Sequence, residues 1–119
     1  MRNKHLPHLN KMICAPLTVE AMSLLDTNDC PDSLLEKIFL TNEEHKKLLN
    51  SGVLEVINNK LGKIIDDYED ESITSYQDLC KSLAIFEDHL TPENSPALKR
   101  LIHLNIIAID KRTGLFFFF

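Results

Sequence analysis

The sequence lacks the features that mark disordered, membrane-spanning and secreted proteins, and it lacks two common catalytic motifs. Three glycines and five prolines in 119 residues argue against a low-complexity or disordered chain, and neither a glycine-rich phosphate loop nor a GxSxG nucleophile elbow occurs. No apolar run reaches the roughly 18 residues that a membrane-spanning helix needs, and the first residues lack the apolar segment of a secretory signal. The length favours one small domain.

Cysteine is also scarce. The chain has Cys14, Cys30 and Cys80, and no two of them have the spacing of a CxxC motif. The odd count and the absence of that motif predict a cytoplasmic protein with reduced thiols. His5 and His8 could bind a metal together with Cys14, but no second cluster at ligand spacing accompanies them, so neither a metal nor another cofactor is expected.

Catalytic patterns are missing as well. Glu44 and His45 resemble part of the metalloprotease motif HExxH, but residue 48 is a leucine, so the motif is absent. Cys80 lies on the apolar side of an expected helix, where a small core residue is more common than a nucleophile. The sequence therefore predicts a protein that is not an enzyme.

Charge is plentiful but unevenly distributed. The formal net charge is −5, yet residues 66–93 alone carry −8, while residues 1–15 and 94–119 carry +3 each. The densest acidic stretch comprises Asp66, Asp67, Glu69, Asp70 and Glu71. It lacks the glycine and the regular spacing of a calcium loop. A solvated loop is the simpler interpretation, and the functional one is a patch that repels nucleic acid and steers a basic protein partner.

Helical patterns dominate the first half of the chain after residue 16. Residues 1–16 are expected to form an extended arm, and 17–119 a single helical domain with a hydrophobic C-terminal tail. The expected helices begin at Thr18, at Pro31 and at a capping box formed by Thr41 and Glu44. Gly52 is expected to end the third helix in the left-handed conformation, and a fourth helix to run from Val53 to Tyr68.

The second half is expected to hold two more helices and an irregular tail. Thr74 and Gln77 form a second capping-box pattern before a fifth helix. A sixth helix opens at Thr91–Pro92 or Ser95–Pro96 and closes at Asn105. The remaining NIIAIDKRTGLFFFF could form a small hairpin or pack as a hydrophobic tail against the last helices.

Residues 31–61 resemble one repeat of the armadillo family. The matching elements are Leu35 and Ile38, Glu43–Glu44, Leu48–Leu49, Ser51–Gly52, Val53–Leu54, Ile57 and Leu61. The resemblance implies stacked helices and a protein-binding surface. The chain departs from the members that read nuclear-localisation signals, because it has no tryptophan. We therefore expect an all-α domain of about six helices with armadillo-like packing and, as an option, a small C-terminal β-hairpin.

Two functions remain open from the sequence. The first is a non-catalytic protein-binding module, such as an inhibitor or immunity-type protein that neutralises a basic partner such as a toxin. The alternative is a winged-helix DNA-binding regulator built from residues 72–119, which would contact phosphates or bases through Lys99, Arg100, His103, Lys111 and Arg112. Against it stand the acidic neighbourhood and the small number of cations, which would give weak binding at physiological salt.

Overall fold

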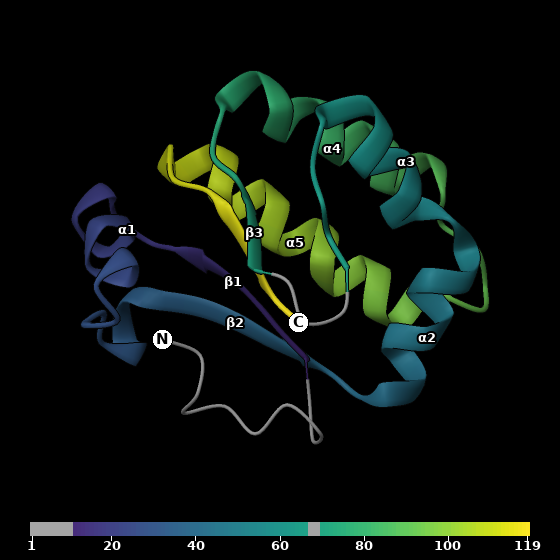
Figure 1. Cartoon of the computed structure of the whole chain (residues 1–119), viewed down its shortest axis with the longest axis horizontal. Helices are drawn as coiled ribbons and strands as arrows, with labels where there is room; N and C mark the ends of the chain where they lie inside the picture. The colour runs from purple at the N-terminus through teal and green to yellow at the C-terminus, as the bar shows by residue number, and fades with distance from the viewer. Residues whose placement is uncertain (1–10, 67–69) are drawn as a thin grey trace.

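The chain folds as an α+β domain and not as the all-α domain expected above (Figure 1). The computed structural model describes residues 11–66 and 70–119. Within them lie five α-helices and four strands. In chain order these are β1 (Lys11–Pro16), α1 (Val19–Asp26), β2 (Leu35–Leu40), α2 (Asn42–Ser51), α3 (Val53–Leu61), β3 (Asp70–Ile73), α4 (Tyr76–Asp88), α5 (Ser95–Lys111) and β4 (Leu115–Phe118). The armadillo-like packing of six helices was therefore a wrong prediction.

The four strands form one antiparallel sheet in the order β2-β1-β4-β3. In its register Ile13 of β1 lies between Ile38 of β2 and Phe117 of β4, and Leu115 of β4 pairs with Ile73 of β3. The last strand, β4, thus lies inside the sheet, between β1 and β3, which come much earlier in the sequence.

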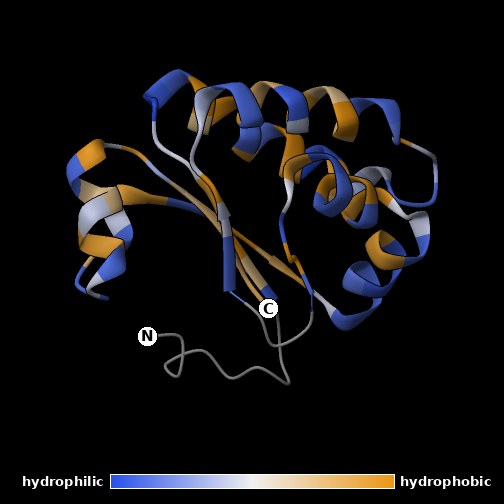
Figure 2. Cartoon of the chain, turned by 45° about the horizontal axis from the view of Figure 1, so that its top comes forward, coloured by the Kyte–Doolittle hydropathy of each residue, from blue (hydrophilic) through white to orange (hydrophobic). Residues whose placement is uncertain are grey.

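Alternation along the strands divides the sheet into two faces. On the first, Ile13, Leu40, Ile73 and Phe117 are buried together with the inner side of α5, which lies directly against the strands. Helix α4 packs against α5, and α3 packs against α4. Figure 2 shows the apolar colour of strands and helices turned toward this interior. We call this the helix-covered face. Among residues 11–66 and 70–119, the only helix on the opposite face is α1, which contacts β1, and we call this face the open face.

The expected second helix after Pro31 is instead a strand. One turn of 3-10 helix spans Asp32–Leu34, and Leu35–Leu40 then pairs along its whole length with β1. Its apolar residues fit a helical period and an alternating one equally well over so short a run. The pairing with β1, which no local pattern encodes, decides between the two.

Several local signals of the sequence are confirmed. Thr18 accepts a hydrogen bond from the N–H of Ala21 and caps α1, and Thr41 and Glu44 form the complete capping box of α2. Gly52 has φ 80° and lets α2 end and α3 begin at once. The predicted helix to Tyr68 is too long, because α3 already ends at Gly62, which has φ 66°.

The last third of the chain differs more from what the sequence predicted. Ser75, and not Thr74, caps α4 by accepting from the N–H of Asp78. Helix α5 continues past Asn105, which is fully buried, and ends at Arg112, whose φ is 58°. The hairpin is therefore absent, since residues 106–111 remain helical.

The phenylalanine-rich tail forms the inner strand β4. A Cβ placed on Gly114 would lie 3.0 Å from the carbonyl oxygen of Ile73, so glycine allows β4 to approach β3 closely at this point. At the other end of the chain, the described part of the expected arm, residues 11–16, is extended as predicted but belongs to the sheet as β1.

Candidate protein-docking groove

A groove of about 620 Å³ crosses the open face of the sheet, from α1 on one side to β3 on the other. Its floor consists of alternate residues of three strands, Met12, Leu35, Phe39, Phe116 and Phe118. The Phe39 side chain is 43% exposed, and the rings of Phe116 and Phe118 stack with their centroids 6.4 Å apart. A concave surface with an apolar floor and a few polar side chains at its edge is the usual form of a binding site.

The first wall comes from the end of α1 and the turn after it. Leu25 and Asp26 stand at the last turn of the helix, and Asn28 adopts the left-handed conformation with φ 64°. The N–H of Asp29 donates to the carbonyl of Leu24 at 2.9 Å, which closes the turn. This capping geometry fixes the wall beside the sheet.

The second wall is β3 with the segment that leads into it. Glu71 accepts the N–H of Ile64 on Oε2 and the N–H of Ser72 on Oε1, both at 2.9 Å. Asn58 of α3 holds the same segment by exchanging two hydrogen bonds with the backbone of Ile65. The carboxylate of Glu71 is thus fixed at the rim by backbone donors.

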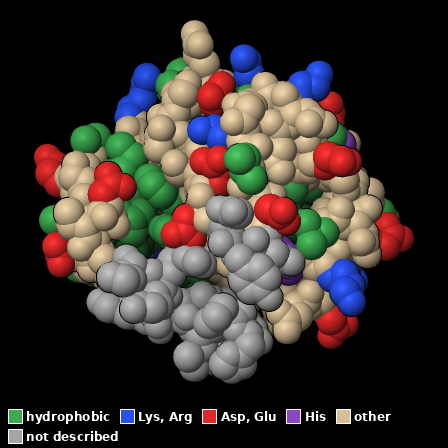
Figure 3. All heavy atoms as spheres, viewed as in Figure 1, with side chains coloured by type: hydrophobic (Ala, Val, Ile, Leu, Met, Phe, Trp, Pro, Cys, Tyr) green, Lys and Arg blue, Asp and Glu red, His purple; other side chains and the backbone are tan. Residues whose placement is uncertain are grey.

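The walls make the groove acidic. Among the described lining residues are four carboxylates, Asp26, Asp32, Asp70 and Glu71, and one cation, Lys37, for a formal charge of −3. The Nζ of Lys37 lies 3.0 Å from Oδ1 of Asp32 and 6.0 Å from the ring centroid of Phe39. Figure 3 shows the apolar surface between α1 and the rest of the molecule, with acidic side chains on both sides.

The predicted acidic patch contributes part of this rim. Asp70 and Glu71 line the groove, and Asp66 is exposed at the end of the preceding segment. Asp67 and Glu69 lie outside the described residues. Sequence reasoning missed Asp26 and Asp32, which reach the same groove from a distant part of the chain.

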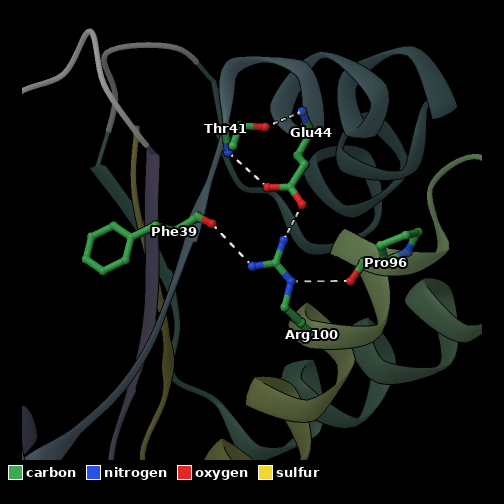
Figure 4. Close-up of polar contacts among 5 residues, drawn as sticks. All are labelled: Phe39, Thr41, Glu44, Pro96 and Arg100. Carbon is green, nitrogen blue, oxygen red and sulfur yellow. Dashed lines mark hydrogen bonds and ion pairs between the residues drawn. The ribbon is translucent and has the colours of Figure 1, made fainter.

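Arg100, an expected nucleic-acid contact, is instead held by contacts within the fold, although its side chain is 41% exposed (Figure 4). Its Nη2 donates to Oε2 of Glu44, its Nη1 to the carbonyl of Phe39 at 3.3 Å, and its Nε to the carbonyl of Pro96 at 3.4 Å. Burial acts to raise the pKa of Glu44, but the hydrogen bonds from Thr41 and Arg100 outweigh it and leave that pKa below its usual range. Arg100 thus ties α5 to α2 and to the edge strand β2.

The other expected nucleic-acid contacts do not gather into one basic surface. Lys99 and His103 lie on the exposed side of α5. Lys111 lies about 18 Å from Lys99 along the helix axis, at about 1.5 Å per residue. Its Nζ is 3.8 Å from Oδ2 of Asp110, and Arg112 stacks over the Tyr76 ring at 4.2 Å. The hairpin that forms the wing of a winged helix is absent from residues 72–119.

The three cysteines are free thiols in different settings. Burial raises the pKa of Cys14 to about 12, Cys30 lines the groove, and Cys80 is exposed. His5 and His8 lie outside the described residues, within which no group of three or more His, Cys, Asp or Glu side chains is arranged to hold a metal ion.

Neither the helices of the chain nor its comparison with known proteins points to a function. In its described part, none of the helices has both the length and the apolar character needed to cross a membrane. The chain matches no family model, no curated protein and no solved structure. Function is therefore argued from the groove itself.

Proposed function

We propose that this chain is a non-catalytic protein-binding module that holds a basic partner in the open-face groove. The observation that carries the proposal is the combination of an apolar floor with four carboxylates on its two walls. A partner with an apolar patch and surrounding Lys or Arg residues would bury the floor and neutralise the rim in one contact. An inhibitor or immunity-type protein that covers a basic toxin or enzyme would have such a surface, in a cytoplasmic setting.

The arrangement of side chains in the groove favours binding over catalysis. Its cation is paired with Asp32, and Glu71 already accepts two backbone N–H groups. Groups held in this way have their hydrogen-bonding capacity used for structure, whereas a general acid or base needs a proton to exchange with a substrate. The acidic rim also disfavours nucleic acid, whose phosphates it would repel.

The test is affinity capture with matched charge variants. The wild type is compared with Asp26→Lys plus Asp70→Lys, which reverses one carboxylate on each wall, and with Asp88→Lys, an exposed change on α4 that is not part of the groove. Capture is carried out at about 50 mM and about 500 mM salt, because screening weakens exposed charge pairs. Each sample is also treated with nuclease.

We expect the wild type and Asp88→Lys to retain the same basic protein after nuclease treatment, and the double variant to lose it. With the purified partner, the association rate of the double variant should fall about tenfold at low salt and by less at high salt. A partner that the double variant retains as well as the wild type does would overturn the proposal. Partners that are lost only after nuclease treatment would instead support the DNA-binding alternative.

A further inference from the structure

The open-face groove has a candidate occupant within the chain. Residues 1–10, which lie outside the described residues, directly precede Lys11, the first residue of β1, and the next residue, Met12, belongs to the groove floor. A segment attached so close to a site has a high effective concentration there, on the order of millimolar when the link is short. Residues 1–10 therefore need only weak contacts to compete with a partner that is free in solution.

The composition of residues 1–10 is complementary to that of the groove. The segment carries Arg2 and Lys4 and no Asp or Glu, which gives a formal charge of +2, whereas the groove lining carries −3. Its apolar residues include Leu6 and Leu9, and the groove floor is made of apolar side chains from three strands. An apolar contact surrounded by opposite charges is the pattern that specific interfaces show.

The groove presents its apolar and acidic parts in order along β1. The floor begins where Met12 pairs with Phe118, near the start of the strand. The carboxylate of Asp32 lies further along, because its Oδ1 is 3.0 Å from the Nζ of Lys37, and Lys37 pairs with Cys14 in the sheet. The Asp32 side chain is 85% exposed and can contact a second cation. A segment that follows β1 from its first residue thus meets the floor first and the carboxylates beside α1 second.

Residues 1–10 carry their apolar and basic residues in the same order. An extended chain spans about 3.3–3.6 Å per residue, so Leu9 and Leu6 lie within about 18 Å of Lys11 and can contact the floor. Lys4 and Arg2 are farther from Lys11 in the sequence and can reach about 32 Å, beyond the length of about 20 Å that six residues give β1. The cations can therefore contact the wall beside α1 while the leucines lie on the floor.

We propose that residues 1–10 bind in the open-face groove and are displaced by the partner, an inference that rests on the proposed function. The cations of the segment contact Asp26 and Asp32, and its leucines contact the apolar floor. Phe39 and Asp70 already have interactions within the chain, so neither is needed as a free contact.

Occupation of the groove regulates access of the partner. Only the fraction of chains with an open groove binds the partner, so the apparent affinity falls by that fraction. If residues 1–10 occupy the groove in about nine chains of ten, their release raises the apparent affinity about tenfold. The segment thereby also excludes basic proteins that contact the groove less well than the partner does.

The first experiment locates the segment in the full chain. Asn3→Cys, between the two cations, carries a nitroxide spin label in a background of Cys30→Ser and Cys80→Ser, while Cys14 is buried and stays unlabelled. Paramagnetic broadening of amide signals then reports which parts of the protein the label approaches. A matched sample mixes spin-labelled with isotope-labelled chains, so that broadening between two copies is detected separately. Circular dichroism of each variant shows whether the fold is retained.

We expect the label to broaden the amides of Thr27 and Asn28, beside the end of α1, within one chain. Asp26→Lys plus Asp32→Lys should remove this broadening, and so should about 500 mM salt, which screens exposed charge pairs. Broadening confined to the end of the sheet around Lys11 would overturn the proposal, because it would leave the segment outside the groove. Broadening only in the mixed sample would overturn it as well and would identify a second copy as the occupant.

The second experiment uses the basic protein recovered by affinity capture. Arg2→Glu plus Lys4→Glu in the full chain should raise its affinity about tenfold at low salt, because the released groove is open. The control Lys46→Glu plus Lys47→Glu makes the same change in net charge at exposed positions of α2 outside the groove. It should change the affinity by less than about threefold. Equal effects of the two variants would overturn the displacement and assign the gain to net charge.

Failure of this inference is distinguishable from failure of the proposed function. A partner that depends on Asp26 and Asp70 but is indifferent to Arg2→Glu plus Lys4→Glu would leave the proposed function standing and overturn the displacement. A partner that is indifferent to Asp26→Lys plus Asp70→Lys would overturn the proposed function and the displacement together, whatever position the spin label reports.

Discussion

Phe117 and Phe118 are neighbours in β4, yet they lie on opposite faces of the same sheet. Phe117 is fully buried under the helices, while Phe118 lies partly exposed in the floor of the groove. The helix-covered face holds the packed core, whereas the open face holds apolar side chains such as Phe39 and Phe118 that stay partly exposed. These partly exposed side chains are the ones that we propose a partner contacts.

The largest expected effect separates these two faces directly. Phe117→Ala should lower the free energy of unfolding by about 3–5 kcal/mol, since it leaves a cavity in the core. Phe118→Ala should lower it by only about 1 kcal/mol, because the side chain is only partly buried. Urea unfolding measures both. If Phe117→Ala does not fold, Phe117→Leu, which leaves a smaller cavity, takes its place in the comparison. Equal losses of unfolding free energy at the two positions would contradict the assignment of Phe117 to the core and Phe118 to the groove.

A second prediction concerns the buried polar contact between α4 and α5, on the helix-covered side of the sheet. Asn105 donates to the carbonyl of Leu79 at 2.9 Å and accepts from the hydroxyl of Ser82 at 2.6 Å, all three residues being buried. Asn105→Ala should cost about 1–3 kcal/mol of unfolding free energy by leaving buried polar groups unsatisfied. Asn59→Ala, at an exposed position of α3, should change it by less than about 0.5 kcal/mol. A neutral Asn105→Ala would show that the contact is not stabilising.

A third prediction uses pH on the link between α2, α5 and β2. Glu44→Gln should cost about 1 kcal/mol at pH 7, since it weakens the capping box and removes the charge pair with Arg100. The folded pKa of Glu44 lies below its unfolded value, so its contribution is present above the unfolded pKa and is lost as pH falls through the folded pKa. The difference between wild type and variant in urea unfolding should therefore shrink toward pH 3. A constant difference would assign the effect to packing alone.

The smallest expected effect on stability, and the sharpest probe of exposure, is thiol alkylation. With iodoacetamide at pH 8, Cys80 should react first and Cys30 in the groove more slowly. Cys14 should react only on unfolding, because burial both shields it and raises its pKa to about 12. Mass spectrometry of peptides gives the order. Protection of Cys30 by a bound partner would place that partner in the groove. Rapid alkylation of Cys14 would show that α1 does not cover that end of the open face.

Local signals were predictable from the sequence because they depend on residues within four positions of one another. The capping box of Thr41 and Glu44 and the corner at Gly52 are of this kind. The strands were not, because β2 becomes a strand only through its pairing with β1, and β4 only through its place between β1 and β3. A segment of four to six apolar residues has no period long enough to decide its own conformation.

The candidate site was predictable in part. The run that contains Asp70 and Glu71 indicated an acidic binding surface from composition alone. The opposite wall came from Asp26 and Asp32, which are unremarkable in sequence and acquire a role only when α1 lies beside the sheet. The alternation that places Leu35 and Phe39 on one face of a strand was the available signal for the floor. We instead assigned Leu34, Leu35, Ile38 and Phe39 to the buried side of a helix.

The place of β4 between β1 and β3 has a consequence for how the chain reaches its fold during synthesis. Thr113, just before β4, donates a hydrogen bond to the carbonyl of Pro16, 97 residues earlier. At about 5–20 residues per second, a ribosome needs on the order of 5–20 s to make the intervening chain. During that time β2 is available to pair with β1, but Phe116 and Phe118 of the groove floor have not yet been made. The surface proposed to receive a partner is therefore complete only after β4 has been made and has entered the sheet.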